Sequence, residues 1–287
     1  MFQYAVGRHL ALKNGTELMV DTTHFEQIPK NRDHFVRREY DLDIFSIDVK
    51  KLEPRAMNWL PHYSTKPTHR LKHFAKRFFH LDKYKDNYEV RREREYFAFD
   101  EDILNAGSNT YLVGHWQNEK YFKAIEKQLR QDFRFQNTFD AAVHELARQI
   151  SQVDSLCLNI RRTDFVHNPM HGFVGLDYIS NAVEYVKGQV NLEKIYVFSD
   201  EIEWCKENLR FDVPCSFVAH NFAGPKFSSY LYLMTRCHHF VIPNSTFGWW
   251  GAWLSEQPGK MVVAPKQWVN YSGLDATNII PEGWMAL

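Results

Sequence analysis

Residues 155–265 alternate between short apolar runs and amphipathic stretches of helical length, and this pattern constrains the fold more than any other feature. The apolar runs are SLCLNI, KIYVFSD, SFVAH, HHFVIP and KMVVAP. The stretches between them are LDYISNAVEYVKG, EIEWCKENLR, KFSSYLYLMTRC and STFGWWGAWLSE. Strands buried on both faces are near-continuously apolar, and helices joining successive strands make those strands parallel. The sequence therefore predicts an α/β domain with a parallel sheet covered on both faces.

The chain opens on a helical pattern that precedes a strand pattern. The segment FQYAVGRHLALKNG has one apolar stripe and stops at Asn14-Gly15, a frequent helix end. The stripe consists of Phe2, Ala5, Val6 and Leu10. TELMVD, at 16–21, follows as a strand. A βαβ unit needs a strand before this helix, so the first strand of the N-terminal domain is missing, and we expect the native start to lie upstream.

Further along, the first half continues with α/β elements. TYLV at 110–113 predicts a strand, a helix follows from about Lys120, and AAVHELARQI at 141–150 predicts another. A length of 287 residues suits two domains of about 120–160 residues each. We place an N-terminal α/β domain, incomplete at its start, at 1–138 and a Rossmann-like domain at 139–287.

Composition excludes some classes of protein. Lys+Arg and Asp+Glu balance at 35 each, which disfavours a nucleic-acid partner. Apolar runs stay shorter than the roughly 18 residues of a membrane span, and no secretory-signal pattern is visible. Four cysteines without a C-x-x-C pair suit reduced, buried thiols, so we expect a cytoplasmic protein. The basic amphipathic segment 66–85 is either a solvated helix face or a peripheral contact with anionic lipid on the inner membrane face.

Two adjacent arginines end the first strand of the regular half, in NIRRTDF. In an open parallel sheet, ligands bind outside the carboxyl ends of the strands. Arg161 and Arg162 could bind phosphate oxygens there, because a guanidinium keeps its charge and donates in a fork. Asp164 could hold one arginine in place, and the structural alternative is an Arg–Asp pair. Asn159 precedes them as a further hydrogen-bond donor.

A second strand end carries Ser199, Asp200 and Glu201. Asp200 could cap the next helix, with Glu203 completing a capping box. Alternatively, these carboxylates accept hydrogen bonds from the N–H donors of guanine or from a ribose hydroxyl.

A third strand end carries Asn244, Ser245 and Thr246 immediately before a helix. Hydroxyls, backbone N–H groups and the helix dipole together favour an anion, although a plain N-cap explains one of these residues. The tryptophans that follow should pack the helix onto the sheet. The three ends together favour a nucleotide diphosphate, and neither a G-x-G-x-x-G nor a P-loop motif is present.

With these motifs in view, the sequence resembles the α-1,2-fucosyltransferases, glycosyltransferase family 11. NIRRTDF resembles the H-x-R-R-x-D motif, and SDEIEWCKENL and NSTFGWWGAWL resemble two later motifs. MFQYAVGRHLA is similar to the end of the G-G-L-G-N-Q-M-F-Q-Y-A signature, and GHWQNEKYF, HGFVGLDY and NIIPEGW also fit. The R-R-x-D core is shared with α-1,6- and protein-O-fucosyltransferases. Position 159 departs from the family, with Asn where His is usual.

The resemblance implies a GT-B fold, with two Rossmann-like domains facing a cleft, and an inverting transfer from GDP-fucose. It implies no metal and no cofactor besides this co-substrate. The acceptor would be a galactose-terminated oligosaccharide or a lipid-linked glycan. Arg161 would contact the pyrophosphate. The full donor-binding set expected is Gln3, Asn159, Arg161, Arg162, Ser199, Asp200, Glu201, Asn244, Ser245 and Thr246.

Inversion needs the acceptor hydroxyl to attack from the face opposite the leaving group, and a base could take its proton. Asp164, His171 and Glu119 are the candidates, so the expected catalytic residues include Arg161, Asp164 and His171. The D-x-D triplets at 41–43 and 100–102 are disfavoured as metal sites. Remaining alternatives are a fucosyltransferase of another linkage and a nucleotide- or glycan-binding protein without turnover. A glycosidase is disfavoured, since it usually needs two carboxylates across the bond.

Overall fold

The computed structural model describes residues 1–23, 25, 39–52, 89–136, 139–271 and 273–287. The chain forms two compact units, which divide at Ile125–Glu126. Asp41–Ile47 belong to the second unit. The sequence-based division at 138/139 falls inside the second unit and stays a prediction.

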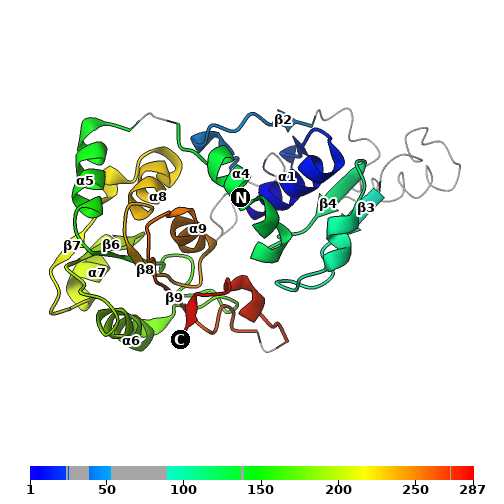
Figure 1. The fold of residues 1–287 in the computed structure, drawn as a ribbon. Coiled ribbons are helices and arrows are strands. Elements are labelled where there is room, and N and C mark those ends of the chain that lie inside the picture. Colours follow the sequence, from blue (N-terminus) through cyan, green and yellow to red (C-terminus); the bar gives the residue numbers. More distant parts are fainter. Residues whose placement is uncertain (24, 26–38, 53–88, 137–138, 272) are drawn as a thin grey trace, which may run out of the picture. The chain divides into compact units, whose positions relative to one another are not determined.

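The second unit is built on a six-stranded sheet in which every pairing is parallel (Figure 1). The strand order is β10-β9-β8-β5-β6-β7. The strands are β5 (Ser155–Ile160), β6 (Lys194–Ser199), β7 (Cys215–Phe217), β8 (His239–Val241), β9 (Val262–Ala264) and β10 (Met285–Ala286). The α/β class and the parallel sheet are confirmed. The sequence did not predict β10, because its two residues form no apolar run.

The strand order reverses beside β5. The chain runs outward from β5 through β6 to β7, then returns to place β8 on the other side of β5 and continues to β9 and β10. Leu156 pairs with Ile195 of β6 and with His239 of β8, so β5 lies at the centre. This is the doubly wound order, in which ligands bind at the reversal point. A ligand site is therefore expected at the carboxyl ends of β5 and β8.

Helices cover both faces of this sheet (Figure 1). On one face lie α6 (Gly175–Lys187) and α7 (Ile202–Asn208). On the other lie α5 (Ala141–Ser151), α8 (Ser228–Met234) and α9 (Thr246–Leu254). Alternate residues of β5 face opposite sides, as a strand requires. Leu156, Leu158 and Ile160 join the apolar core under α6 and α7.

Helix α9 is buried almost throughout, which explains its apolar sequence. Trp249, Trp250 and Trp253 are all buried, as the sequence predicted, and the Trp249 indole N–H donates to the Ile279 carbonyl at 2.7 Å. Gly251 faces α8, where an added Cβ would lie 2.7 Å from the Met234 methyl. Small residues on one side of α9 thus allow close packing while the tryptophans fill the other sides.

The first unit begins with α1 (Phe2–Asn14), which ends at Gly15 in the left-handed conformation, φ 63°. The predicted stripe is buried, and this helix is confirmed. The strand expected over 16–21 shortens to β1 (Met19–Val20), which pairs with β2 (Lys50–Lys51). β3 (Glu89–Arg92) pairs in parallel with β4 (Thr110–Val113), the strand predicted at those residues.

The helix expected from about Lys120 is broken into shorter pieces. Two 3₁₀ turns, Glu119–Tyr121 and Lys123–Ile125, precede α4 (Glu126–Asp132). Further 3₁₀ turns lie at Leu42–Ile44, Glu101–Asn105, His220–Phe222, Pro225–Phe227 and Thr277–Ile279.

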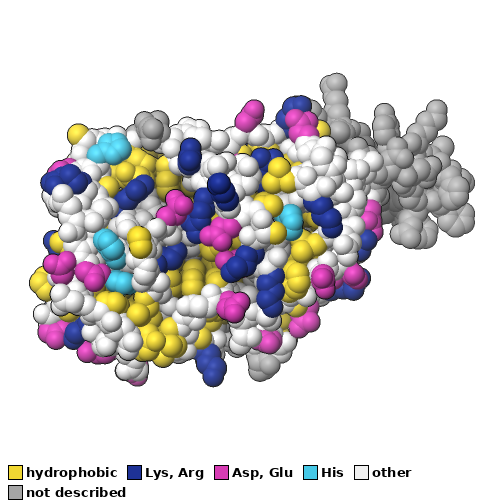
Figure 2. All heavy atoms as spheres, viewed as in Figure 1, with side chains coloured by type: hydrophobic (Ala, Val, Ile, Leu, Met, Phe, Trp, Pro, Cys, Tyr) yellow, Lys and Arg dark blue, Asp and Glu magenta, His cyan; other side chains and the backbone are white. Residues whose placement is uncertain are grey.

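The segment 66–85, for which the alternatives were a solvated helix face and a peripheral membrane contact, lies outside the described residues. Within the described part of the chain, no helix has the length and apolar character needed to cross a bilayer. Figure 2 shows basic and acidic side chains interspersed on the face drawn, in keeping with the equal numbers of each in the sequence.

Candidate functional site

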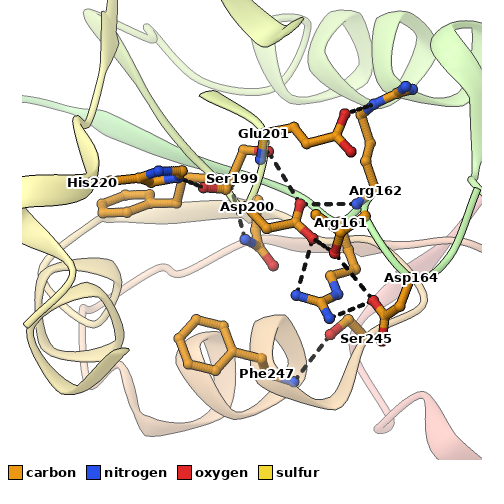
Figure 3. A network of polar contacts seen from close by, with 12 residues as sticks. Arg161, Arg162, Asp164, Ser199, Asp200, Glu201, His220, Ser245 and Phe247 are labelled. Carbon is orange, nitrogen blue, oxygen red and sulfur yellow. Dashed lines mark hydrogen bonds and ion pairs between the residues drawn. The ribbon is translucent and has the colours of Figure 1, made fainter. Parts of the chain in front are cut away.

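The sequence-predicted residues of the second unit gather at the carboxyl ends of β5, β6 and β8. Arg161 follows β5, Asp200 follows β6, and Ser245 lies between β8 and α9. Figure 3 shows these residues side by side, with α9 starting beneath the arginines. The cluster therefore lies at the point where the strand order reverses.

Arg161 is held between two carboxylates. Its Nη1 lies 3.0 Å from Asp200 Oδ2, and its Nη2 donates to Asp164 Oδ1. The Asp200 bond joins the ends of neighbouring strands β5 and β6, and the Asp164 bond closes the turn after β5. The Arg161 side chain keeps 22% of its surface exposed, so its guanidinium is fixed yet reachable from solvent.

Arg162 points away from Arg161 and toward Glu201 (Figure 3). Its Nε donates to Glu201 Oε2 at 2.9 Å, and its guanidinium carbon lies 3.7 Å from the Trp204 ring centre. The Phe173 ring adds a second contact at 4.9 Å. Cation–π contacts on both rings fix this side chain by packing as well as by charge. Arg162 is thus part of the support of the site.

Asp200 organises the backbone as well as Arg161. Its Oδ1 accepts from the Arg162 backbone N–H at 2.9 Å, and its Oδ2 accepts from the Thr163 hydroxyl at 2.5 Å. The turn after β5 is therefore tied to the end of β6 by one carboxylate. Two arginines here face three carboxylates, those of Asp164, Asp200 and Glu201. The structural alternative, an Arg–Asp pair, is present in this structure.

The capping box predicted for Asp200 and Glu203 is wrong. Helix α7 begins at Ile202, after Glu201, and no side chain caps it. Asp200 instead forms an ion pair with Arg161 and hydrogen bonds with the turn after β5. The Ser199 hydroxyl accepts from the Glu201 backbone N–H at 2.9 Å, closing a local turn.

Asn159 is buried at the end of β5 and clamps two strands. Its Nδ2 donates to the Phe198 carbonyl of β6 at 3.1 Å. Its Oδ1 faces α9, where a Cβ added to Gly248 would lie 2.7 Å away. Asn159 therefore links β5, β6 and α9, and its predicted contact with a nucleotide stays a prediction.

The end of β8 is joined to the loop that follows the arginines. Asn244 Nδ2 donates to the His171 carbonyl at 2.9 Å and to the Trp268 carbonyl at 3.1 Å. Ser245 is the N-cap of α9, and its hydroxyl accepts from Phe247 N at 3.4 Å. Thr246, half-buried, is the first residue of the helix. N–H groups at the start of a helix attract anions.

His171 is half-buried and stacks on Phe165, with ring centres 4.9 Å apart and an interplanar angle of 12°. Burial lowers the pKa of His171 below its ordinary value, and the nearby Asp164 carboxylate opposes that shift. Among the described residues, its buried Nδ1 has no hydrogen-bond partner. A neutral imidazole with a free nitrogen is able to accept a proton.

Two predicted residues lie in the first unit. Gln3 donates from Nε2 to the Gly114 carbonyl at 2.7 Å, and Glu119 Oε2 accepts from Lys123 Nζ at 3.1 Å. Their proposed contacts with donor or acceptor stay predictions.

The acidic triplets have structural partners. Asp43 lies 2.7 Å from Lys226 Nζ, and Asp100 accepts from the Asp102 backbone N–H at 3.1 Å as the cap of a 3₁₀ turn. In the described ranges, three or more His, Cys, Asp or Glu side chains do not gather anywhere as a metal site would require.

Sequence reasoning missed four residues around the site. Thr163 and Trp204 were inside quoted motifs, but their contacts depend on how β5 and β6 pair. His220 Nε2 lies 2.9 Å from the Ser199 carbonyl, at the end of β6. Phe227 contacts Phe247 at the start of α9. The last two were inside runs predicted as a strand, 216–220, and as a helix, 226–237, and neither run marked them as site residues.

Comparison with known proteins supplies the class. The profile described as Glycosyl transferase family 11 matches residues 49–287. The chain belongs to this family of glycosyltransferases.

Proteins similar in sequence to this chain occur in bacteria and in mammals. An *Escherichia coli* alpha-1,2-colitosyltransferase is 32% identical over 180 residues, covering 61% of this chain and 62% of the relative. The O-antigen biosynthesis glycosyltransferase WbnK of the same organism is 27% identical over 301 residues, covering 100% and 96%. Galactoside alpha-(1,2)-fucosyltransferase 2 of *Sus scrofa* is 24% identical over 161 residues, covering 52% and 46%.

Solved structures give more distant matches. Fucosyltransferase NodZ from Bradyrhizobium matches with a TM-score of 0.45 and 14% identity, covering 88% of this chain and 87% of that one. POFUT1 in complex with GDP-fucose matches with a TM-score of 0.40 and 10% identity, covering 92% and 93%.

Proposed function

We propose that this protein transfers L-fucose from GDP-β-L-fucose to the 2-hydroxyl of a terminal galactose, with inversion and without a metal ion. The observation that carries the proposal is the position of Arg161 in this family 11 chain. Arg161 is held by Asp200 where the strand order reverses, beside the N-terminus of α9. A cation and a helix N-terminus that converge on one spot favour a diphosphate.

Arg161 acts on the leaving group. When the bond between the fucosyl carbon and the β-phosphate oxygen breaks, its electron pair stays on the phosphate and negative charge grows there. A guanidinium already held in place stabilises that charge without reorganising. Asp200 and Asp164 keep Arg161 oriented, and the remaining guanidinium N–H groups donate to phosphate oxygens.

The start of α9 supports the same anion. Ser245 and Thr246 bring hydroxyls, and the first N–H groups of a nine-residue helix carry partial positive charge. In a metal-free transfer, Arg161 and the start of α9 are the groups that stabilise the phosphate charge.

The acceptor hydroxyl attacks the opposite face of the fucose ring and loses its proton as the new bond forms. His171 and Asp164 both follow the arginines in the chain. Burial lowers the pKa of His171 and so favours a neutral ring that is able to accept a proton, whereas Asp164 is engaged by Arg161. We therefore assign the proton to His171 and the orientation of Arg161 to Asp164.

A second donor deserves a test because of one observation, the match to an alpha-1,2-colitosyltransferase. Colitose is fucose without the 3-hydroxyl, so the two donors share the nucleotide and differ at one position of the sugar. The other predictions from the sequence, a cytoplasmic location and a lipid-linked or free galactosyl acceptor, belong to this proposal.

The experiment is a GDP-release assay with GDP-fucose or GDP-colitose and a panel of β-galactosides, run with and without EDTA. We expect release with GDP-fucose that depends on a terminal galactose and survives EDTA. Release only with GDP-colitose would show that the transferred sugar is colitose and not fucose. Loss of release with EDTA would overturn the metal-free claim, and GDP binding without release for any acceptor would favour a binding protein. Product linkage is read by NMR.

A further inference from the structure

The turn that leads into α8 has an unusual backbone. Lys226 and Phe227 are consecutive non-glycine residues in the left-handed region, with φ of 54° and 57°. Their Cβ atoms make that conformation unfavourable, so it persists only where the surroundings impose it. Because of it, α8 begins at Ser228, later than the sequence predicted.

The surroundings that impose this conformation are visible. Gly224 has φ 68°, and an added Cβ there would collide with the Ser229 hydroxyl. Lys226 Nζ is held by the Asp43 carboxylate at 2.7 and 2.8 Å. The turn is therefore fixed at both ends, and the direction of the Phe227 side chain follows from it.

The result is a phenylalanine ring that stays 48% exposed. The edge-on neighbour of Phe227 is Phe247, with ring centres 6.4 Å apart and an interplanar angle of 77°. Tyr230 lies 6.2 Å away on another side. A strained backbone that keeps an apolar ring in solvent does not serve core packing, since burial would be more favourable.

The ring lies next to the diphosphate site of the proposed function. Phe247 is the second residue of α9, and its backbone N–H donates to the Ser245 hydroxyl. Figure 3 shows the Phe247 ring extending from the start of α9 on the side away from Asp164. His220, which contacts the end of β6, lies 6.2 Å from Tyr230. The aromatic rings thus continue the site from the ends of β6 and β8.

We propose that Phe227 stacks on the nucleobase of the donor, with Phe247 as the edge-on second wall. The inference rests on the proposed nucleotide-sugar activity and assigns a base-specificity residue to it. A purine offers a wide π-face for an exposed ring, and a phosphate at the start of α9 brings the attached nucleoside toward these aromatics. Phe227 positions the donor and takes no part in bond breaking.

The test is isothermal titration with GDP and with inorganic pyrophosphate. Loss of one base–aromatic stack predicts that Phe227→Ala binds GDP about 5- to 150-fold more weakly. Phe227→Trp should restore GDP binding, because a larger ring stacks as well. Pyrophosphate binding should be unchanged in both variants, whereas Arg161→Ala should weaken both ligands.

Two further variants separate stacking from folding. Phe227→Gly removes the ring and suits a positive φ, so it should lose GDP binding yet unfold no earlier than Phe227→Ala. Tyr96→Ala removes a ring of similar exposure, 51%, from the other unit and should bind GDP like the wild type.

The outcomes are separable. Wild-type protein that does not bind GDP defeats the proposed function itself. Wild-type binding that Phe227→Ala leaves intact overturns this inference alone. So does a loss that Phe227→Trp fails to restore, or an equal loss for GDP and pyrophosphate, since either result indicates a general disturbance of the site. A raised acceptor KM with unchanged GDP binding would assign the ring to the acceptor.

Discussion

The two ends of the six-stranded sheet are lined by very different groups. The carboxyl end carries Arg161 and the start of α9. The amino end carries a hollow of about 430 Å³, whose lining includes Asp154, His238 and His239. Charge and topology favour the carboxyl end as the place for an anion, although the hollow lies at the amino end.

The difference follows from chain direction. In a parallel sheet, helices begin after the carboxyl ends of strands, so free N–H groups collect there. Helix carbonyls collect at the amino end, where the Ser155 hydroxyl donates to the Ile150 carbonyl at 2.9 Å. Lys260 Nζ donates to the Ala252 and Ser255 carbonyls at 2.6 and 2.7 Å. The hollow is therefore poorly suited to phosphate, and anion chemistry belongs at the other end.

The largest expected effect is that of Arg161→Ala, at the carboxyl end. Loss of one preorganised donor to a developing anion costs on the order of 100- to 1000-fold in kcat. The matched change at the amino end, His238→Ala, should leave kcat nearly unchanged. Both are measured by GDP release at saturating donor, with thermal unfolding as the check on folding. Comparable losses in the two variants would break the contrast between the ends.

The next effect concerns the packing that brings α9 to β5. Gly248→Ala would place a Cβ 2.7 Å from Asn159 Oδ1 and 3.2 Å from Pro243 Cδ. Overpacking of this kind costs about 1–3 kcal/mol in the free energy of unfolding. Gly107→Ala is the control, because an added Cβ there meets nothing within 4 Å. Denaturant unfolding measures both, and equal stability of the two variants would contradict the close contact.

A pH effect should arise at the amino end. Burial lowers the pKa of His239 below its ordinary value of 6.5, while Asp154, 2.8 Å away, opposes the shift and His238 adds to it. The unfolded chain then binds the proton more readily than the folded one. Stability is therefore complete above pH 6.5 and falls as the pH drops through 6.5 toward the lowered pKa.

His239→Gln should make that acid loss shallower. The measurement is the free energy of unfolding between pH 5 and 8, compared with the wild type. His171, whose pKa burial also lowers, should leave a residual slope in the variant. An unchanged slope after the substitution would show that His239 does not contribute.

The smallest effect is expected for the ion pair beside the strained turn. Asp43→Asn removes the nearer carboxylate partner of Lys226, to which Asp41 also lies close at 3.8 Å. The Asp43 and Lys226 side chains are 56% and 31% exposed. Exposed pairs contribute roughly 0–1 kcal/mol, less at high salt. Unfolding at low and high salt tests this, and a loss well above 1 kcal/mol would show that the pair holds the turn itself.

Much of the fold was predictable because its signal is local. Apolar runs and helical periodicity located β5, β6, β8 and the helices between them, and the carboxyl-end rule located Arg161, Asp200 and Ser245. Element ends were less predictable. α8 starts late because Lys226 and Phe227 are left-handed, and the neighbours of this turn, Gly224 and Asp43, lie outside the helix.

The pairings inside the site were not predictable. Helix capping and donor binding were both predicted for Asp200, and β5–β6 pairing brings it instead to Arg161 and Thr163. His220 and Phe227 were predicted as the end of a strand and the start of a helix, yet both lie in 3₁₀ turns that reach the site. Such contacts depend on three-dimensional neighbours far apart in sequence, about which local patterns carry little information.

The reversal of strand order beside β5 also has a consequence for biogenesis. β5 and β6 pair between nearby segments, whereas β8 inserts next to β5 only after the β7 and α8 segments have been made. Arg161 follows β5 and Ser245 follows β8, the two strands whose pairing forms late. A ligand held by both binds only the completed sheet and stabilises it by mass action. Under the proposed function, a bound nucleotide therefore raises the free energy of unfolding of the completed domain.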